Sequence, residues 1–196
     1  MISCILLAAG KSSRFGSPKP LAPLGPKTVI EHIQERLLLT GLSEIIIVLG
    51  HKAESIAPFI YKGPRVKSIV NTDYALGQTS SFKAGLNAVS PYSEGIMLLP
   101  VDMPAIQPDT IEELTHIFIK RAPLILVPSY QGHNGHPPVF SKRLKEELLC
   151  MENDEPLSTL IHKHEAEILK IPVDDPGVTA SFNTPEELQL LIRQIS

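Results

Sequence analysis

The chain has 196 residues, 43% of them hydrophobic and 20% charged, which is long and apolar enough to bury a core as one domain over residues 1–196. Lys and Arg number 18 against 21 Asp and Glu, so the net charge is -3. That balance excludes a general positive field for nucleic acid or an anionic membrane, and we expect neither as a partner. An anionic ligand must be bound by local groups.

No apolar run reaches the roughly 20 residues that cross a bilayer, and the first residues lack the pattern of a secretory leader. We therefore expect a cytoplasmic protein. The two cysteines, Cys4 and Cys150, are too few for a disulfide framework and too isolated for a zinc site. We expect both to be reduced core residues.

Short apolar runs bounded by turn residues predict fully buried strands over residues 2–7, 44–49, 66–70, 95–99, 124–127 and 168–173. Helical patterns lie among them, with apolar faces at Val29–Leu38, Ile111–Phe118 and Leu188–Ile195. This alternation predicts an α/β, three-layer Rossmann-like fold with a mostly parallel sheet and ligands at the carboxyl ends of its strands. The loop Gln131–Pro138 interrupts the pattern and leads to a predicted antiparallel strand through Val139 and Phe140.

A loop of small residues follows the first strand directly, in the segment LLAAGKSSRFGSPKPL. Its backbone N–H groups and serine hydroxyls can approach anionic oxygens closely, and Lys11, Arg14 and Lys19 can neutralise charge, so the loop is suited to polyphosphate. It matches neither GxxxxGK[ST] nor GxGxxG. The alternative is a solvated basic turn, which the position directly after a buried strand disfavours.

A second strand, in MLLPVDMP, ends just before Asp102. A carboxylate at that strand end faces the same crevice as the first loop and is a ligand that Mg²⁺ prefers. The alternative is an N-cap or turn carboxylate, a role that Asp109 fits better, with Glu112 three residues on. His133 and His136 lack a third ligand nearby for zinc.

The segments LAAGKSSRFGSPK and LPVDMP together resemble the nucleotidyltransferase family that includes molybdenum cofactor cytidylyl- and guanylyltransferases. NTDYALGQTSSFKAGL resembles the family's segment after the third strand, where a Gly and a later Ser touch the base and ribose. GHPPVF resembles the loop before the acceptor-binding strand, and SFNTPEEL the last motif before the terminal helix. The resemblance covers nearly the whole chain and implies a fold of the nucleotide-diphospho-sugar transferase type.

The family's activity implies transfer of a nucleoside monophosphate from a nucleoside triphosphate to a phosphate-bearing acceptor, with release of pyrophosphate. Such a reaction depends on in-line positioning and neutralisation of charge. By resemblance, the catalytic residues are Arg14, Lys19 and Asp102, the Mg²⁺ ligands Asp102 and Asn183, and the acceptor-binding residues Gly135 and His136. The nucleotide-binding residues are Leu7, Ala8, Ala9, Gly10, Lys11, Ser12, Ser13, Lys19, Asn71, Gly77, Ser81 and Pro100.

Some motifs of this chain resemble the guanylyltransferases of the family, and others resemble the cytidylyltransferases. Asn183 in NTP is typical of guanylyl relatives, whereas LAAG, GQTSS and GHPP resemble the cytidylyl side. We expect CTP and a molybdopterin-type acceptor, with docking to a molybdoenzyme or its chaperone; GTP and a sugar or polyol phosphate stay open. Asn183 could instead cap the last helix, as could Thr184.

A protein of another class could use the same crevice to hold a nucleotide or a molybdenum cofactor for delivery, without transferring anything. Intact Arg14, Lys19 and Asp102 favour the enzyme, because a delivery protein has no need of cations that stabilise a departing pyrophosphate. The acidic residues before Pro156 in CMENDEPLSTL are expected to open a helix and not to bind metal.

Overall fold

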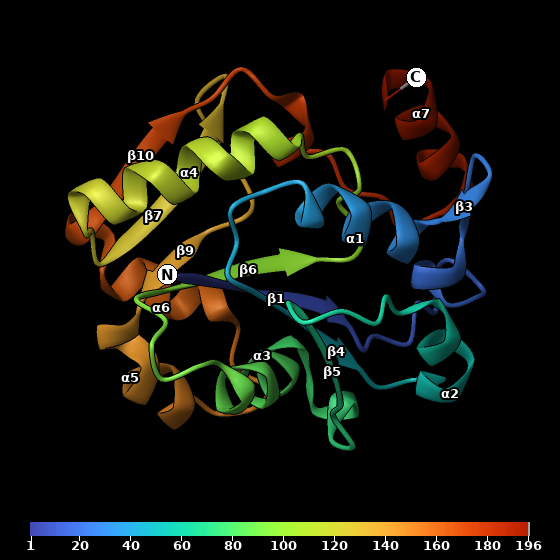
Figure 1. Ribbon diagram of the computed structural model, residues 1–196, viewed down its shortest axis with the longest axis horizontal. Helices are drawn as coiled ribbons and strands as arrows, with labels where there is room; N and C mark the ends of the chain where they lie inside the picture. The colour runs from blue at the N-terminus through green and yellow to red at the C-terminus, as the bar shows by residue number, and fades with distance from the viewer. Residues whose placement is uncertain (196) are drawn as a thin grey trace.

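The computed structural model describes residues 1–195 and is built around one large sheet (Figure 1). Its strands run in the order β10-β7-β9-β6-β1-β4-β5, with β8 paired to β7. Neighbours are parallel except where β9 pairs with β6 and β7 and β8 with β7, so the sheet is mostly parallel and the predicted antiparallel strand is confirmed. The strands are β1 (Ile2–Ala8), β4 (Glu44–Leu49), β5 (Val66–Val70), β6 (Gly95–Pro100), β7 (Ile125–Tyr130), β8 (His133–Asn134), β9 (Val139–Ser141) and β10 (Ile168–Pro172), and a small hairpin joins β2 (Pro23–Leu24) to β3 (Lys27–Thr28).

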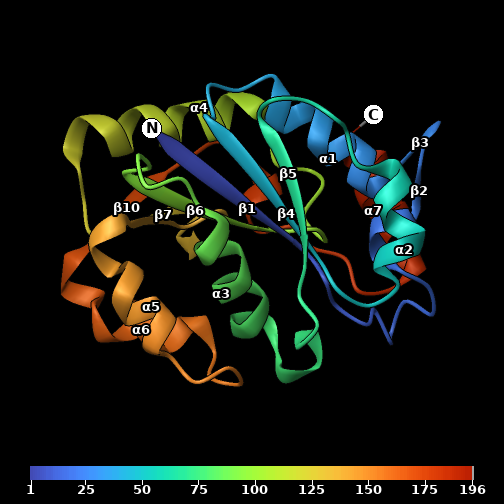
Figure 2. The ribbon, with the colours of Figure 1, turned by 60° about the horizontal axis from the view of Figure 1, so that its bottom comes forward.

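Helices cover both faces of the sheet, as Figure 2 shows, and the three-layer prediction is confirmed. One face carries α1 (Val29–Leu38), α4 (Pro108–Arg121) and α7 (Pro185–Ile195), and the other carries α3 (Gln78–Ala88), α5 (Lys145–Cys150) and α6 (Leu157–Lys163). A short helix, α2 (Ala53–Ile56), follows β4. Single 3-10 turns span Lys19–Leu21, Ala57–Phe59, Tyr74–Leu76, Lys142–Leu144, Glu165–Glu167 and Pro176–Val178.

Strand β1 shows why its sequence is continuously apolar. Cys4 and Leu6 belong to the core under α1 and α4, whereas Ile5 and Leu7 belong to the core under α3, α5 and α6. Successive side chains of a strand point to opposite faces, so a strand covered on both sides needs an apolar residue at every position.

Three expectations are wrong. Strands β5 and β10 are the edges of the sheet and are partly exposed, not fully buried. Cys150 is exposed, because it stands two positions after buried Leu148 in α5 and so faces the other way. Asp109 is not the cap of α4: Pro108 takes the first helical position, so Gln107 is the cap residue, and its side chain makes no capping hydrogen bond.

The carboxyl ends of β1 and β6 lie side by side at the centre of the sheet. Leu7 is in register with Pro100, and the backbone N–H of Val101 donates to the carbonyl oxygen of Leu7 at 3.1 Å. The loop after β1 and the segment that carries Asp102 therefore open into one space. Among residues 1–195 no helix is long and apolar enough to cross a membrane.

Candidate active site

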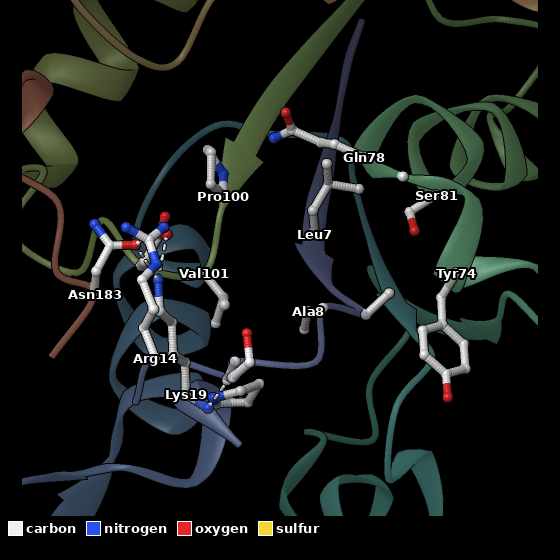
Figure 3. A pocket seen from close by; sticks show the side chains of 17 residues that line it. Leu7, Ala8, Arg14, Lys19, Tyr74, Gln78, Ser81, Pro100, Val101 and Asn183 are labelled. Atoms are coloured by element: carbon white, nitrogen blue, oxygen red, sulfur yellow. Dashed lines mark hydrogen bonds and ion pairs between the residues drawn. The ribbon is translucent and has the colours of Figure 1, made fainter. Parts of the chain in front are cut away.

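A cavity of about 370 Å³ lies at the carboxyl ends of β1 and β6 (Figure 3). This volume falls within the range of small-ligand sites. Arg14 and Asn183 stand at one end, and Tyr74 and Ser81 at the other, so the cavity has a charged end and a neutral end. Its lining comprises Leu7, Ala8, Ala9, Gly10, Ser12, Ser13, Arg14, Lys19, Pro20, Tyr74, Gly77, Gln78, Ser81, Pro100, Val101, Asp102 and Asn183.

The loop after β1 turns at Ser12, whose φ of 52° is in the left-handed region. The carbonyl oxygen of Ser12 accepts from the backbone N–H groups of Phe15 and Gly16, and its hydroxyl oxygen accepts from the N–H of Lys19 at 3.1 Å. Within residues 1–195, no protein group accepts from the backbone N–H groups of residues 10–14. These donors, on a loop rich in cations, are suited to an anion.

At the charged end, Lys19 joins two oxygen ligands. Its Nζ lies 2.8 Å from Asp102 Oδ2 and 3.2 Å from Asn183 Oδ1, and its side chain is only 12% exposed. Arg14 Nη2 donates to the same Asn183 oxygen at 2.9 Å. The aromatic ring of Phe182, with its centroid 5.2 Å from Lys19 Nζ, supports the ammonium from beneath. Asn183 therefore directs its side chain into the cavity and does not cap α7; the Thr184 hydroxyl accepts from the Glu187 N–H instead.

The same arrangement is compatible with a divalent cation. A carboxylate oxygen and an amide oxygen converge on one ammonium, so a positive charge already stands between two hard oxygen ligands. Asp102 Oδ1 has no hydrogen-bond partner among the described residues. Two protein ligands suit Mg²⁺, which usually keeps waters and substrate phosphates in its remaining positions. No group of three His, Cys, Asp or Glu side chains in residues 1–195 forms a closed metal site.

The neutral end is built by the segment between β5 and α3. Gly77 adopts φ 133°, a conformation that L side chains rarely take, and a Cβ there would lie 3.1 Å from the carbonyl oxygen of Asn153. The chain turns at Gly77 directly into α3, which places Gln78 and Ser81 on the cavity wall. Tyr74 completes the wall.

A second cavity, of about 480 Å³, adjoins the first and shares Gln78, Pro100, Asp102 and Asn183 with it. Gly135 and His136 line it. Burial lowers the pKa of His136 below its usual value, and Asp102 only partly opposes this effect, so the imidazole is neutral at pH 7. A neutral ring can donate one hydrogen bond and accept another.

A buried carboxylate holds together the loops that shape these cavities. Asp175, 4% exposed, accepts from the Gln107 N–H at 2.9 Å, the Thr110 hydroxyl at 2.8 Å and the Gly177 N–H at 2.8 Å. Further along the same loop, the N–H of Phe182 donates to the carbonyl oxygen of Asp102 at 3.1 Å. Asp102 and Asn183 are therefore positioned by one connected scaffold.

The structure brings most of the sequence-predicted residues to the two cavities, but it places two of them elsewhere. Lys11 is exposed and outside the lining, and Asn71 is buried behind the wall that Ser81 forms. Pro20, Tyr74, Gln78 and Val101 also line the first cavity and were not predicted from the sequence. Three of them adjoin a predicted residue and Tyr74 lies three residues from both Asn71 and Gly77, so chain proximity is the signal that would have found them.

The fold and the cavity define a nucleotide-binding α/β protein of the nucleotidyltransferase class. Residues 4–168 match the model of the MobA-like NTP transferase domain. The chain belongs to this family, whose members include molybdenum cofactor cytidylyl- and guanylyltransferases, and it is an enzyme of the nucleotidyltransferase type. The family resemblance read from the motifs is thereby confirmed.

Two relatives are each 33% identical to the chain. One is the molybdenum cofactor cytidylyltransferase of Escherichia coli K12, with 72% of this chain and 70% of the relative covered. The other is the nicotine blue oxidoreductase of Paenarthrobacter nicotinovorans, with 74% and 72% covered.

Among solved structures, Rv0371c of Mycobacterium tuberculosis H37Rv superposes with a TM-score of 0.85 at 27% identity, covering 98% of this chain and 97% of its own. A structure of Rv0371c in complex with manganese superposes with a TM-score of 0.81 at 25% identity, covering 98% of each chain.

Proposed function

We propose that the chain transfers CMP from CTP to the phosphate of a molybdopterin-type acceptor and releases pyrophosphate. One observation carries this proposal: Lys19, Asp102 and Asn183 meet at 2.8 and 3.2 Å at the junction of two cavities. Beside them is the loop whose N–H groups at residues 10–14 have no acceptor within residues 1–195. The first cavity suits a nucleoside triphosphate and the second its acceptor. The whole chain would act as one domain, because Asn183 joins the site from beyond the matched residues 4–168.

In this reaction an acceptor phosphate oxygen forms a bond to the α-phosphorus of CTP. The bond from that phosphorus to the bridging oxygen breaks, and pyrophosphate leaves with the electron pair. No strong base is required, because the attacking phosphate is already anionic. Arg14 and Lys19 would offset the charge that develops on pyrophosphate, while the N–H groups of residues 10–14 hold the triphosphate in line.

Asp102 and Asn183 would hold the divalent cation, Mg²⁺ in this proposal, which when bound offsets phosphate charge. Lys19 would then exchange these two oxygens for phosphate oxygens. Its long side chain can make this exchange without moving the backbone. The relative solved in complex with manganese supports a divalent cation in this fold.

The second cavity would hold the acceptor. Its neutral His136 can donate a hydrogen bond to an acceptor oxygen without adding charge. Gly135 lets the loop that carries His136 pack closely, since a Cβ there would lie 2.5 Å from the carbonyl oxygen of Val178. The name of the Escherichia coli relative supports a molybdenum cofactor as acceptor and CTP as donor.

Pyrophosphate release from CTP, GTP, ATP and UTP with Mg²⁺, in the presence and absence of purified molybdopterin, tests the proposal. The expected result is release from CTP only when the acceptor is present. Preferred release from GTP would replace the cytidylyl assignment by the guanylyl one. Nucleotide binding without release with any phosphate acceptor would support a delivery protein.

The relative named nicotine blue oxidoreductase points to a second candidate activity. A reduced nicotinamide nucleotide could place its phosphates on the same loop, because backbone N–H groups such as those of residues 10–14 would bind phosphate oxygens without regard to the base. The assay therefore also follows NADH and NADPH with an added electron acceptor. Their oxidation in the absence of any pyrophosphate release would displace the transferase proposal.

A further inference from the structure

Behind the neutral end of the first cavity, the amide of Asn71 has a fixed orientation. Its Oδ1 accepts from the backbone N–H of Asp73 at 3.0 Å, and a backbone N–H can only donate. The other amide atom is therefore the nitrogen, and its two hydrogens go to Ser80 Oγ at 3.0 Å and Ser81 Oγ at 3.1 Å. Asn71 is 7% exposed, and both polar atoms of its side-chain amide are hydrogen-bonded within the protein.

The two serine hydroxyls differ in where their own hydrogen goes. Ser80 donates to the carbonyl oxygen of Asp73 at 3.0 Å and does not line the cavity. Ser81 accepts from Asn71 but donates to no group among the described residues, and its hydroxyl lies on the cavity wall opposite Arg14 and Asn183 (Figure 3). The hydrogen of Ser81 is therefore available to a ligand at the neutral end.

We propose that Asn71 is a positioning residue that makes Ser81 a hydrogen-bond donor to N3 of a cytosine base. This inference rests on the proposed function, since the charged end must hold the phosphates for the base to reach Ser81. Cytosine N3 is an acceptor, whereas N3 of uracil and N1 of guanine carry hydrogens; O2 is an acceptor in both cytosine and uracil and does not distinguish them. A wall that donates therefore favours cytosine over bases that present a donor at the same place.

The substitution Asn71→Asp inverts this polarity with nearly the same shape. One carboxylate oxygen still accepts from the Asp73 N–H, and the other accepts from the serine hydroxyls. Ser81 then donates inward and presents lone pairs to the cavity. The added charge weakens all triphosphates together, so the informative quantity is the ratio of affinities between nucleotides.

Ser81→Ala removes the donor without adding charge, and it keeps the proposal testable if Asn71→Asp does not fold. Ser80→Ala is the matched control, because the Ser80 hydroxyl faces Asp73 and not the cavity. Each protein is titrated calorimetrically with Mg²⁺ and each of the four nucleoside triphosphates, and with dCTP, in the absence of acceptor so that no turnover occurs.

We expect the wild type to prefer CTP to UTP and Ser81→Ala to reduce this preference about fivefold, the effect of one neutral hydrogen bond. Asn71→Asp should reduce it further, by about tenfold or more, whereas Ser80→Ala should leave it within about twofold. Unchanged ratios in both Ser81→Ala and Asn71→Asp overturn the inference while leaving the proposed function intact. If Ser81→Ala changes only the ratio of affinities for CTP and dCTP, the inference is also overturned, because the Ser81 hydroxyl would then contact the ribose and not the base. A wild type that binds no nucleotide refutes the proposed function itself.

Discussion

Replacement of Lys19 by alanine should change two properties in opposite directions. The ammonium stands between Asp102 and Asn183, so in the free protein it competes with any divalent cation for their oxygens. In the complex the same ammonium would face the leaving pyrophosphate. The variant should therefore bind metal more tightly and turn over more slowly.

The structure sets the size of each effect. The Lys19 and Asp102 side chains are 12% and 28% exposed, so their ion pair is partly screened by water and contributes about 1 kcal/mol. Loss of that competition should tighten metal binding about fivefold. Loss of one charged donor to a developing anion typically lowers kcat about 10²–10³-fold. The free energy of unfolding should fall by no more than about 1 kcal/mol.

Metal binding is measured by titrating the nucleotide-free protein with Mn²⁺ and following the free ion by electron paramagnetic resonance, and turnover by pyrophosphate release. Lys142→Ala is the control, because it removes another lysine from a carboxylate, Glu94, away from both cavities. The control should change neither property. Weaker or unchanged Mn²⁺ binding in Lys19→Ala would refute the reasoning, since Asp102 and Asn183 would then not be the metal ligands.

Three predictions concern stability. Asp175→Ala leaves buried donors unpaired and should lower the free energy of unfolding in urea by about 3 kcal/mol; a loss below about 1 kcal/mol would mean that the carboxylate does not hold the loops. Hydrogen bonds to Glu167 and Glu147 raise the pKa of His164, so the stability that these bonds contribute is present below pH 6.5 and is lost as the pH rises through the raised pKa of the folded state. Glu167→Gln should therefore lower the melting temperature at low pH but not at high pH, and an equal loss at both would contradict this. Gly85→Ala places a Cβ 2.6 Å from a side-chain methyl of β1 and should cost about 1–3 kcal/mol by the same urea measurement, whereas a neutral effect would show that this helix-to-sheet contact can relax.

The parts of the fold that depend on local pattern could be predicted from the sequence. The continuous apolar run of β1 predicted a strand buried on both faces, and the structure confirms it. The small, basic loop after it predicts a place for phosphate, and the structure places most of that loop on the wall of the first cavity. Asp102 could be predicted to face the same crevice because it comes at the end of a predicted strand; in the structure it lies two residues after β6, which pairs with β1.

Features that depend on contacts between distant segments could not be predicted. The ion pair of Lys19 and Asp102 joins residues 83 positions apart, and Asp175 binds the start of α4 from 65 and 68 positions away. Nothing in the local sequence distinguishes Asp175 from its neighbour Asp174. Asn71 shows the same limit in another form: its segment was identified, but only the geometry reveals that it orients Ser81 and lies outside the cavity.

The most direct test of the transferase assignment is to observe which phosphorus of CTP is attacked. Phosphorus NMR of the protein with CTP, Mg²⁺ and molybdopterin follows every phosphorus-containing product at once. The account predicts that free pyrophosphate appears together with an equal amount of a new diester-linked diphosphate that joins CMP to the acceptor. Orthophosphate and CDP as the products would place the attack on the γ-phosphorus and contradict the account.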